Sequence, residues 1–275
     1  MMNVYYVSAQ GERLNLTEWP YMINDSALRD YTWACEMKNG RISRLIKATS
    51  EYQIKLAITA DSRKEYVEAA ERLIEVVESD IARNVPGKLY FGNEYMTGFF
   101  YNSFKSDWNK GIDFMFNTLT FVTDAPFWIR EQRYSFDPKS ASFAGAFLNY
   151  PHDYSYDYST SGSKKEIVND HYGACDFEMN IFGPCVNPAI TIGGHLYEVI
   201  TTVGEDEYLR IRSREGSVVK ISKTGEQTNE FNSRNTDYSL FEKIQPGRSD
   251  VTWDGSFGFD ITLFIERSEP EWTLQ

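Results

Sequence analysis

Three histidines and three cysteines are the residues of this chain best suited to metal binding or nucleophilic catalysis. Four of them, His171, Cys175, Cys185 and His195, follow the spacing H-x₃-C-x₉-C-x₉-H. Zinc accepts such a ligand set, but the short C-x₂-C or H-x₃-H pairs that nucleate structural zinc sites are missing. We therefore expect buried cysteines and ordinary loop histidines, and we predict no metal and no other cofactor.

Motifs of known catalytic sites are absent from the sequence. There is no G-x-S-x-G elbow, no H-E-x-x-H pair, no phosphate-binding G-x-x-x-x-G-K-[ST] loop and no strand-linked G-x-G-x-x-G. With only His152, His171 and His195 available, a Ser-His-Asp triad would need a coincidence of folding. The 40 acidic residues make chance carboxylate pairs certain, so such pairs do not indicate glycoside hydrolysis. We predict no catalytic residues and no enzymatic activity.

Aromatic side chains are the remaining candidates for binding. A tyrosine provides a large rigid contact area with a hydrogen-bonding tip, so a Tyr-rich loop can stack on sugar rings or on a partner. The alternative is that these side chains fasten a linker to its own domains, and that Trp253 belongs to the core or its edge. The candidate sugar or partner contacts are Tyr150, Tyr154, Tyr156, Tyr158 and Trp253.

A second aromatic group lies in a predicted hairpin of the first half. Phe99, Phe100 and Tyr101 follow a turn at Gly92-Asn93. We consider these three residues as contacts between subunits, with burial in the core as the alternative.

One helix is predicted, over about residues 61–83. Its apolar residues recur at helical spacing and form one face. Ser62 and Glu65 match a capping box, and Asn84, Pro86 and Gly87 end the helix. The apolar residues are Tyr66, Ala69, Ala70, Leu73, Ile74, Val77 and Ile81. We expect this helix to pack on a β core.

In the rest of the chain, turn signals separate short strand-like runs, as in a β protein. Asn39-Gly40 between two strand-like runs predicts a hairpin, because both turn positions tolerate positive φ. Residues 52–59 alternate apolar and polar side chains, as a half-buried strand does. In the second half, short strands and turns follow one another closely, as in a β-sandwich. The predicted domains are 1–133, a Tyr/Ser-rich connector at 134–165, and 166–275.

Net charge excludes one class of partner. The chain carries −12 overall, of which the first 130 residues hold only −2. Binding to a nucleic acid backbone needs clustered Lys and Arg, so we predict no sequence-specific nucleic acid partner. Apolar runs are too short to cross a bilayer, the N-terminus does not resemble a signal peptide, and the few scattered cysteines suit a reducing compartment.

The order of these motifs resembles the distal tail protein family of long-tailed bacteriophages over nearly the whole chain. In the first half, the predicted helix leads into Pro86–Phe91, and a strand ends in the Pro-Phe-Trp motif of Phe121–Glu131. In the second half, the matching segments are Asn187–Ile192, Tyr208–Ile211, Val219–Ile221, Ser239–Gly247, Val251–Trp253 and Glu266–Trp272. The Tyr-rich connector is not a feature of that family.

The resemblance implies a mainly β fold. The first domain would be a β-barrel or β-sandwich flanked by the helix, and the second a galectin-like β-sandwich. Six copies would form a ring that joins the tail tube on one face to the tail-tip or baseplate hub, or a tail-associated protein, on the other. DNA would pass through this ring. The family has no catalytic residues to carry over.

The same resemblance implies a virion protein at the distal end of the tail, made and assembled in the cytoplasm of the host bacterium. Receptor-binding proteins or cell-wall carbohydrate are further partners that it allows, whereas membrane insertion is not expected. The alternative function is a carbohydrate-binding adhesin that acts through the C-terminal sandwich. An enzyme such as a cell-wall hydrolase is the third hypothesis, and it lacks any motif.

Overall fold

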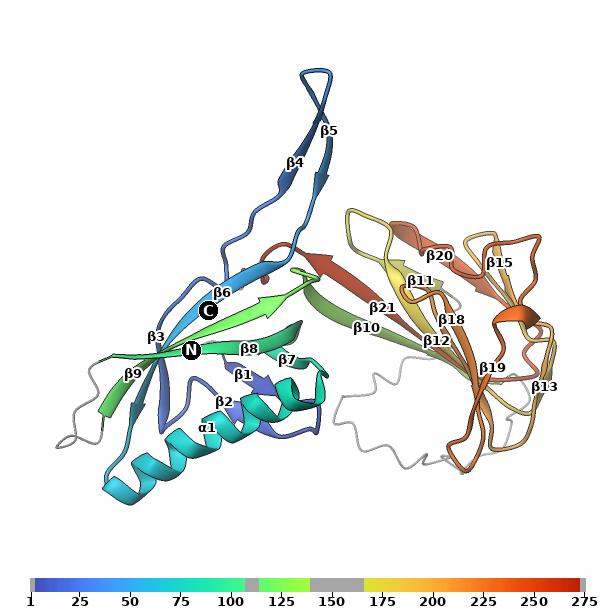
Figure 1. Ribbon diagram of the computed structural model, residues 1–275. Helices are drawn as coiled ribbons and strands as arrows, with labels where there is room; N and C mark the ends of the chain where they lie inside the picture. Colours follow the sequence, from blue (N-terminus) through green and yellow to red (C-terminus); the bar gives the residue numbers. More distant parts are fainter. Residues whose placement is uncertain (1–2, 107–113, 139–165, 273–275) are drawn as a thin grey trace. The chain divides into compact units, whose positions relative to one another are not determined.

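The structure is a computed structural model that describes residues 3–106, 114–138 and 166–272 (Figure 1). It confirms the predicted fold class, because strands dominate and α1 (Arg63–Arg83) is the one α-helix in these ranges. Of the described part, no helix is long and apolar enough to span a membrane.

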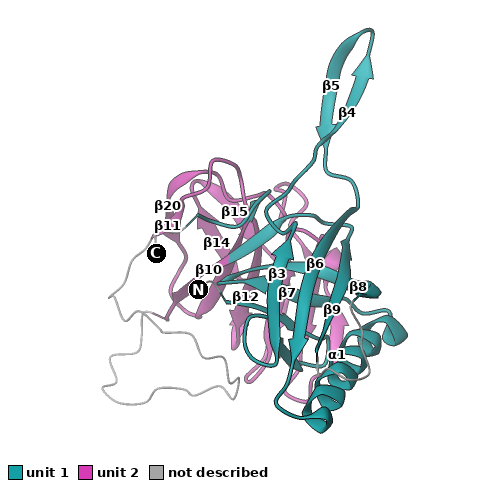
Figure 2. Cartoon of the chain, turned by 90° about the vertical axis from the view of Figure 1, so that its left-hand side faces the viewer, with its two compact units in different colours: residues 1–130, 266–275 teal, residues 131–265 magenta. Residues whose placement is uncertain are grey.

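Two compact units make up the chain (Figure 2). Unit 1 comprises residues 1–130 and 266–275, and unit 2 comprises residues 131–265. The last ten residues group with unit 1, whereas the predicted second domain, 166–275, includes them. The limits 1–133, 134–165 and 166–275 therefore stay a prediction, and most of the connector lies outside the described residues.

Unit 1 is built from antiparallel strands around one core. Strands β3, β6, β9 and β8 form a four-stranded sheet in that order. The first half of β8 also pairs with β7, and the order then continues through β1 to β2. Among the described strands no pairing joins β2 to β3, so the sheets form no closed barrel. The strands are β1 (Val4–Val7), β2 (Arg13–Asn15), β3 (Tyr21–Ser26), β4 (Ala34–Lys38), β5 (Arg41–Ile46), β6 (Ser50–Thr59), β7 (Gly87–Phe91), β8 (Glu94–Ser106) and β9 (Phe114–Thr123).

The helix α1 begins and ends at the predicted signals. The Ser62 hydroxyl accepts a hydrogen bond from the Glu65 backbone N–H, and Asn84 at the C-terminus has the left-handed φ of 52°. One face, which includes Tyr66, Ala69 and Leu73, is buried in the core of unit 1. The amphipathic pattern therefore gave the correct element. Most of the predicted face is buried or half-buried, whereas Ile81 is 44% exposed.

A buried polar contact ties the first strand to the end of α1. The Tyr6 hydroxyl donates to Asp80 Oδ2 at 2.6 Å, and the Ala9 N–H donates to Oδ1 at 2.9 Å. Burial and the neighbouring Asp80 carboxylate raise the pKa of Tyr6 far above its ordinary value, so its hydroxyl stays a donor. Gly87 must lack a side chain here, because a Cβ would lie 2.2 Å from the Tyr6 oxygen.

The C-terminal segment is held in unit 1 by two side chains. The Arg29 guanidinium lies 3.8 Å from the Trp272 ring centroid and donates to the Pro270 carbonyl oxygen at 3.0 Å. The buried Glu94 carboxylate accepts from the Glu271 N–H at 2.7 Å. Sequence patterns could not show that residues so far apart along the chain belong to one unit.

Unit 2 is a β-sandwich. One sheet runs in the order β19-β18-β17-β12-β21-β10, and the other in the order β11-β20-β14-β15. Side chains of both sheets, such as Phe177, Leu209, Ile190 and Val251, share one hydrophobic core. The elements are β10 (Trp128–Phe136), β11 (Glu166–Asn169), β12 (Asp176–Phe182), β13 (Cys185–Val186), β14 (Ala189–Ile192), β15 (His195–Glu198), β16 (Thr202–Val203), β17 (Tyr208–Arg212), β18 (Ser217–Ile221), β19 (Gln227–Asn229), the 3₁₀ turn Phe231–Ser233, β20 (Gly247–Thr252) and β21 (Phe259–Arg267).

Candidate assembly surfaces

A projecting hairpin is the most unusual surface of unit 1 (Figures 1 and 2). It consists of β4, the turn Asn39-Gly40 and β5, and we call residues 34–46 the arm. Asn39 and Gly40 have φ of 52° and 71°, which is the backbone that the Asn-Gly pair predicts. In both strands every residue is exposed except Ile46, so the arm has no packed face of its own.

The arm is apolar on one face. Cys35 lies opposite Leu45, and Met37 lies opposite Ile42. Directly opposite residues point to the same side of a ribbon. A bulge at Ser43 brings Ile42 to this side, since strict alternation from Leu45 would turn it away. Met37 and Ile42 are each 61% exposed and Leu45 is 52% exposed.

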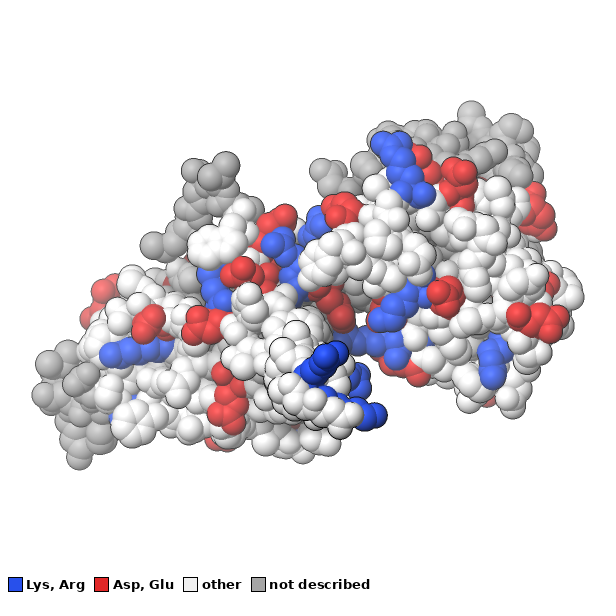
Figure 3. Space-filling view, turned by 90° about the horizontal axis from the view of Figure 1, so that it is seen from above, with Lys and Arg blue, Asp and Glu red and all other residues white. Residues whose placement is uncertain are grey.

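The arm is also basic. It contains three basic residues, Lys38, Arg41 and Arg44, and one acidic residue, Glu36, whereas the net charge of the whole chain is −12. Elsewhere the two signs are mixed, and the face drawn in Figure 3 shows acidic and basic side chains side by side. The arm therefore combines uncovered apolar side chains with a charge opposite to that of the whole chain.

An aromatic cage holds the base of the arm. The Lys47 ammonium lies 5.1 Å from the Tyr31 ring centroid, 5.2 Å from that of Trp33 and 5.5 Å from that of Phe127. Burial lowers the pKa of Lys47, and its Nζ has no hydrogen-bond partner among the described residues. The rings thus take the place of polar partners and fix the point from which the arm leaves unit 1.

The four-stranded sheet of unit 1 has two free edges. On one side, β3 pairs only with β6 in the described part of the chain. On the other, β8 beyond Gly98 pairs only with β9, because β7 ends its pairing there. Free strand edges are ready to pair with another chain. A large apolar side chain, Phe104, lies on the β8 edge and is 66% exposed.

The predicted subunit contacts in β8 divide between core and surface. Phe100 is buried and packs against Tyr6 and Phe121, with ring centroids about 5 Å apart. Phe99 is half-buried. Tyr101 is 49% exposed, and its hydroxyl donates to Glu51 Oε1 at 2.8 Å. Of the three predicted subunit contacts, Tyr101 and Phe99 therefore have surface that is accessible to a neighbouring copy, whereas Phe100 does not.

Trp253, the other candidate contact in the described residues, lies at the edge of the core of unit 2. It packs against Phe136 and Phe259, and its indole N–H donates to the Phe257 carbonyl oxygen at 2.9 Å. Its role in sugar binding stays a prediction. The four candidate tyrosines, Tyr150, Tyr154, Tyr156 and Tyr158, lie outside the described residues.

The histidines and cysteines considered for zinc have other contacts. Cys175 and Cys185 are buried, and burial raises the pKa of Cys185 to about 11. His195 Nε2 donates to the Ser239 carbonyl oxygen at 2.8 Å. Within the described ranges, no three side chains of His, Cys, Asp or Glu lie together as metal ligands would.

A shallow depression lies on the surface of unit 2. It has a volume of about 330 Å³ and is lined by Gln227 and Asn229 of β19, Phe231 and the strand β18. The amide side chains could hydrogen-bond to the hydroxyls of a sugar. The Phe231 ring is already covered, because the Arg234 guanidinium lies 3.7 Å from its centroid and the ring stacks with Phe241. Sequence reasoning missed this group, since its residues are few and unremarkable in the sequence.

Only a weak signal in the sequence indicates that the arm projects from unit 1. Asn39-Gly40 identified the hairpin, but Met37, Ile42 and Leu45 look like ordinary core residues of strands. The available signal was weak: basic residues occur in both strands, next to the apolar ones.

Comparison with solved structures shows the fold. The chain superimposes on the Dit protein of phage SPP1, described as a paradigm of the hub adsorption apparatus in phages that infect Gram-positive bacteria, with a TM-score of 0.59 and 10% identity over 97% of this chain and 99% of that chain. Two structures of the activated baseplate of phage P2, with Ca and with Sr, match with TM-scores of 0.59 and 0.61 and 11% identity. The match covers 98% of this chain and 99% and 100% of theirs. No protein-family model and no curated protein sequence matches the chain.

Proposed function

We propose that this chain, which has the fold of the SPP1 Dit protein, is a structural component of a phage tail that assembles as a ring. The observation that carries the proposal is the likeness of fold over nearly the full length of both chains. It includes both units and agrees with the resemblance drawn from the sequence motifs. We assign the chain no catalytic step.

The free edges of unit 1 support assembly by copies of the chain. In a closed ring each copy contacts its neighbours through two different surfaces. The four-stranded sheet offers such a pair, β3 on one side and β8 beyond Gly98 on the other. We infer that the β3 edge of one copy meets the β8 edge of the next, and that six copies close the ring.

Size in solution tests this assembly. We expect the purified chain to form hexamers by mass photometry and rings by electron microscopy. Phe104→Asp, on the β8 edge, should convert rings to monomers, because it buries a charge in the contact. Val186→Asp is the matched control, since Val186 is 69% exposed but lies in unit 2. A chain that stays monomeric at high concentration would contradict the ring.

The ring would lie at the distal end of the tail, between the tail tube and the tail-tip or baseplate hub, with DNA passing through it. The host cytoplasm is then the place of synthesis and assembly. Electron microscopy of the intact particle with this chain labelled tests the location. A label on the capsid or on side fibres would contradict it.

A carbohydrate-binding adhesin is the second candidate function. The amide side chains of Gln227 and Asn229 in the depression favour it, because amides hydrogen-bond to sugar hydroxyls. We expect any binding on a glycan array to be lost in Gln227→Ala/Asn229→Ala and kept in Tyr172→Ala, because Tyr172 is 84% exposed but does not line the depression. Trp253→Ala tests the predicted contact at Trp253 separately. Tyr154→Ala tests the Tyr-rich loop separately. No binding by the wild-type chain would exclude this function for unit 2.

A further inference from the structure

No other part of the described chain packs over the apolar face of the arm. A two-stranded hairpin alone is marginally stable in water, and Met37, Ile42 and Leu45 remain more than half exposed. An exposed apolar cluster on a projecting element marks an interaction site. The occupant of this site can be argued from charge and from the other surfaces of unit 1.

We propose that the arm docks on helix α1 of a neighbouring copy of this chain, so that its apolar face covers the solvent-facing side of that helix. This inference rests on the proposed assembly and names a contact beyond the strand edges.

Helix α1 presents a surface of matching composition. Val67, Ile74 and Ile81 are spaced seven residues apart, so they form one row along the helix, and Val67 and Ile81 are 42% and 44% exposed. Beside this row runs an acidic row on the exposed face. Its members are Glu68, Glu71, Glu75 and Glu78.

Charge favours a second copy as the partner. The arm carries a net positive charge, whereas the copies as a whole carry −12 each and repel one another. Lys38, Arg41 and Arg44 lie on the side of the ribbon opposite Met37 and Ile42. Their attraction to the acidic row of α1 therefore acts across the thin ribbon, not through direct ion pairs, and it offsets part of that repulsion. Complementary charge also fixes orientation and speeds association.

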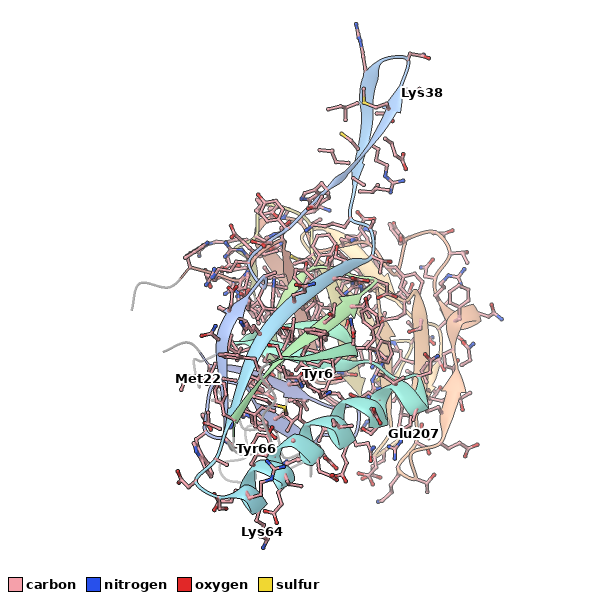
Figure 4. The ribbon with its side chains drawn as sticks, turned by 60° about the vertical axis from the view of Figure 1, so that its left-hand side comes forward. Tyr6, Met22, Lys38, Lys64, Tyr66 and Glu207 are labelled. Carbon is pink, nitrogen blue, oxygen red and sulfur yellow. The ribbon has the colours of Figure 1, made fainter. Side chains whose placement is uncertain are left out.

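The position of the two surfaces excludes contact within one molecule. The arm and α1 lie at opposite ends of unit 1, as the labels of Lys38 and Lys64 show in Figure 4, and Figures 1 and 2 agree. A contact between two different surfaces of successive copies is the kind that closes a ring. The arm therefore reaches α1 only in another copy.

The cage at the base lowers the entropic cost of docking. Lys47 follows β5 directly and lies within 5.5 Å of the ring centroids of Tyr31, Trp33 and Phe127, so these contacts restrain the base of the arm. An element that is positioned before binding loses less freedom when it binds.

Cysteine cross-linking tests the contact directly. Cys35 lies on the apolar face of the arm and is exposed, whereas Cys175 and Cys185 are buried. We expect Val67→Cys to form covalent oligomers with Cys35 of a neighbouring copy under mild oxidation or with a short bismaleimide. Mass spectrometry should find two peptides joined between positions 35 and 67. Val186→Cys is the matched control and should give no cross-link, and Cys35→Ala should abolish the reaction of Val67→Cys.

Each outcome separates the docking from the ring. Oligomers that form without a link between positions 35 and 67 would overturn the docking while the ring stands. Links between Cys35 and Cys35 of two copies would show that arms meet each other, which also overturns it. A strict monomer would overturn both the ring and the docking.

A charge swap provides the second test. Arg41→Glu/Arg44→Glu and Glu75→Arg/Glu78→Arg should each weaken association by about tenfold. A one-to-one mixture of the two variants should recover rings in which the variants alternate, because every arm then meets a helix of opposite charge. The chain that carries all four changes should recover most of the affinity. No recovery in that chain would contradict the proposed partner surface.

Discussion

At the scale of single residues, Gly87 and Tyr6 show how closely the core of unit 1 is fitted. The Tyr6 hydroxyl fills the place that a side chain at position 87 would need. We expect Gly87→Ala to lower the free energy of unfolding by about 1–3 kcal/mol, because the Tyr6–Asp80 contact must move. Chemical denaturation measures this loss. Gly173→Ala is the control, since the nearest atom to its new Cβ lies at 3.5 Å, and equal stability losses would contradict the argument.

Glu94 makes the stability of unit 1 depend on pH. Burial raises the pKa of its carboxyl, so the folded state favours the neutral form. The stability contributed by this group is complete below the ordinary carboxyl pKa and is lost as the pH rises through the raised value. Glu94→Gln keeps an acceptor for the Glu271 N–H and should raise Tm by about 2–4 °C at pH 7. The difference should vanish at low pH; a constant difference across the pH range would contradict this account.

At the scale of elements, the arm depends on its base. Replacing Lys47 with Ala removes the cation that Tyr31, Trp33 and Phe127 surround. We expect amide hydrogens of residues 34–46 to exchange about tenfold faster in this variant, while those of α1 keep their rates. Hydrogen exchange with mass spectrometry makes the measurement. Lys64→Ala is the control, because Lys64 is an exposed residue of α1, and unchanged exchange in the arm of Lys47→Ala would show that the cage does not hold it.

Local signals in the sequence predicted most helices and strands, but they did not predict which of their side chains are covered by other parts of the chain. The amphipathic pattern, Ser62 and Asn84 gave α1 correctly, and Asn39-Gly40 gave the turn of the arm. Exposure of Met37 and Ile42 could not be predicted, because an alternating strand looks the same whether or not another layer covers it. The return of residues 266–272 to unit 1 depends on contacts of Arg29 and Glu94 that no local pattern encodes.

At the scale of the whole molecule, a core substitution in one unit should lower the unfolding temperature of that unit alone. Leu56 is fully buried in the core of unit 1, and Leu209 in that of unit 2. Truncating either leucine to alanine leaves a cavity and should cost about 2–5 kcal/mol. Scanning calorimetry should show each substitution lowering the temperature of a different transition. One transition that shifts equally in both variants would show that the units unfold together.

The path of the chain has a consequence for how a protein of this fold can change. Unit 2 is an insertion, because the chain enters it through β10 and leaves it through β21 before ending in unit 1. The entering strand β10 and the leaving strand β21 are neighbours in one sheet, so the chain enters and leaves unit 2 side by side. A different sandwich with neighbouring ends could be spliced between the same two strands without moving either end of unit 1. Evolution or an engineer could therefore exchange unit 2 for another module while the strands of unit 1 are left intact.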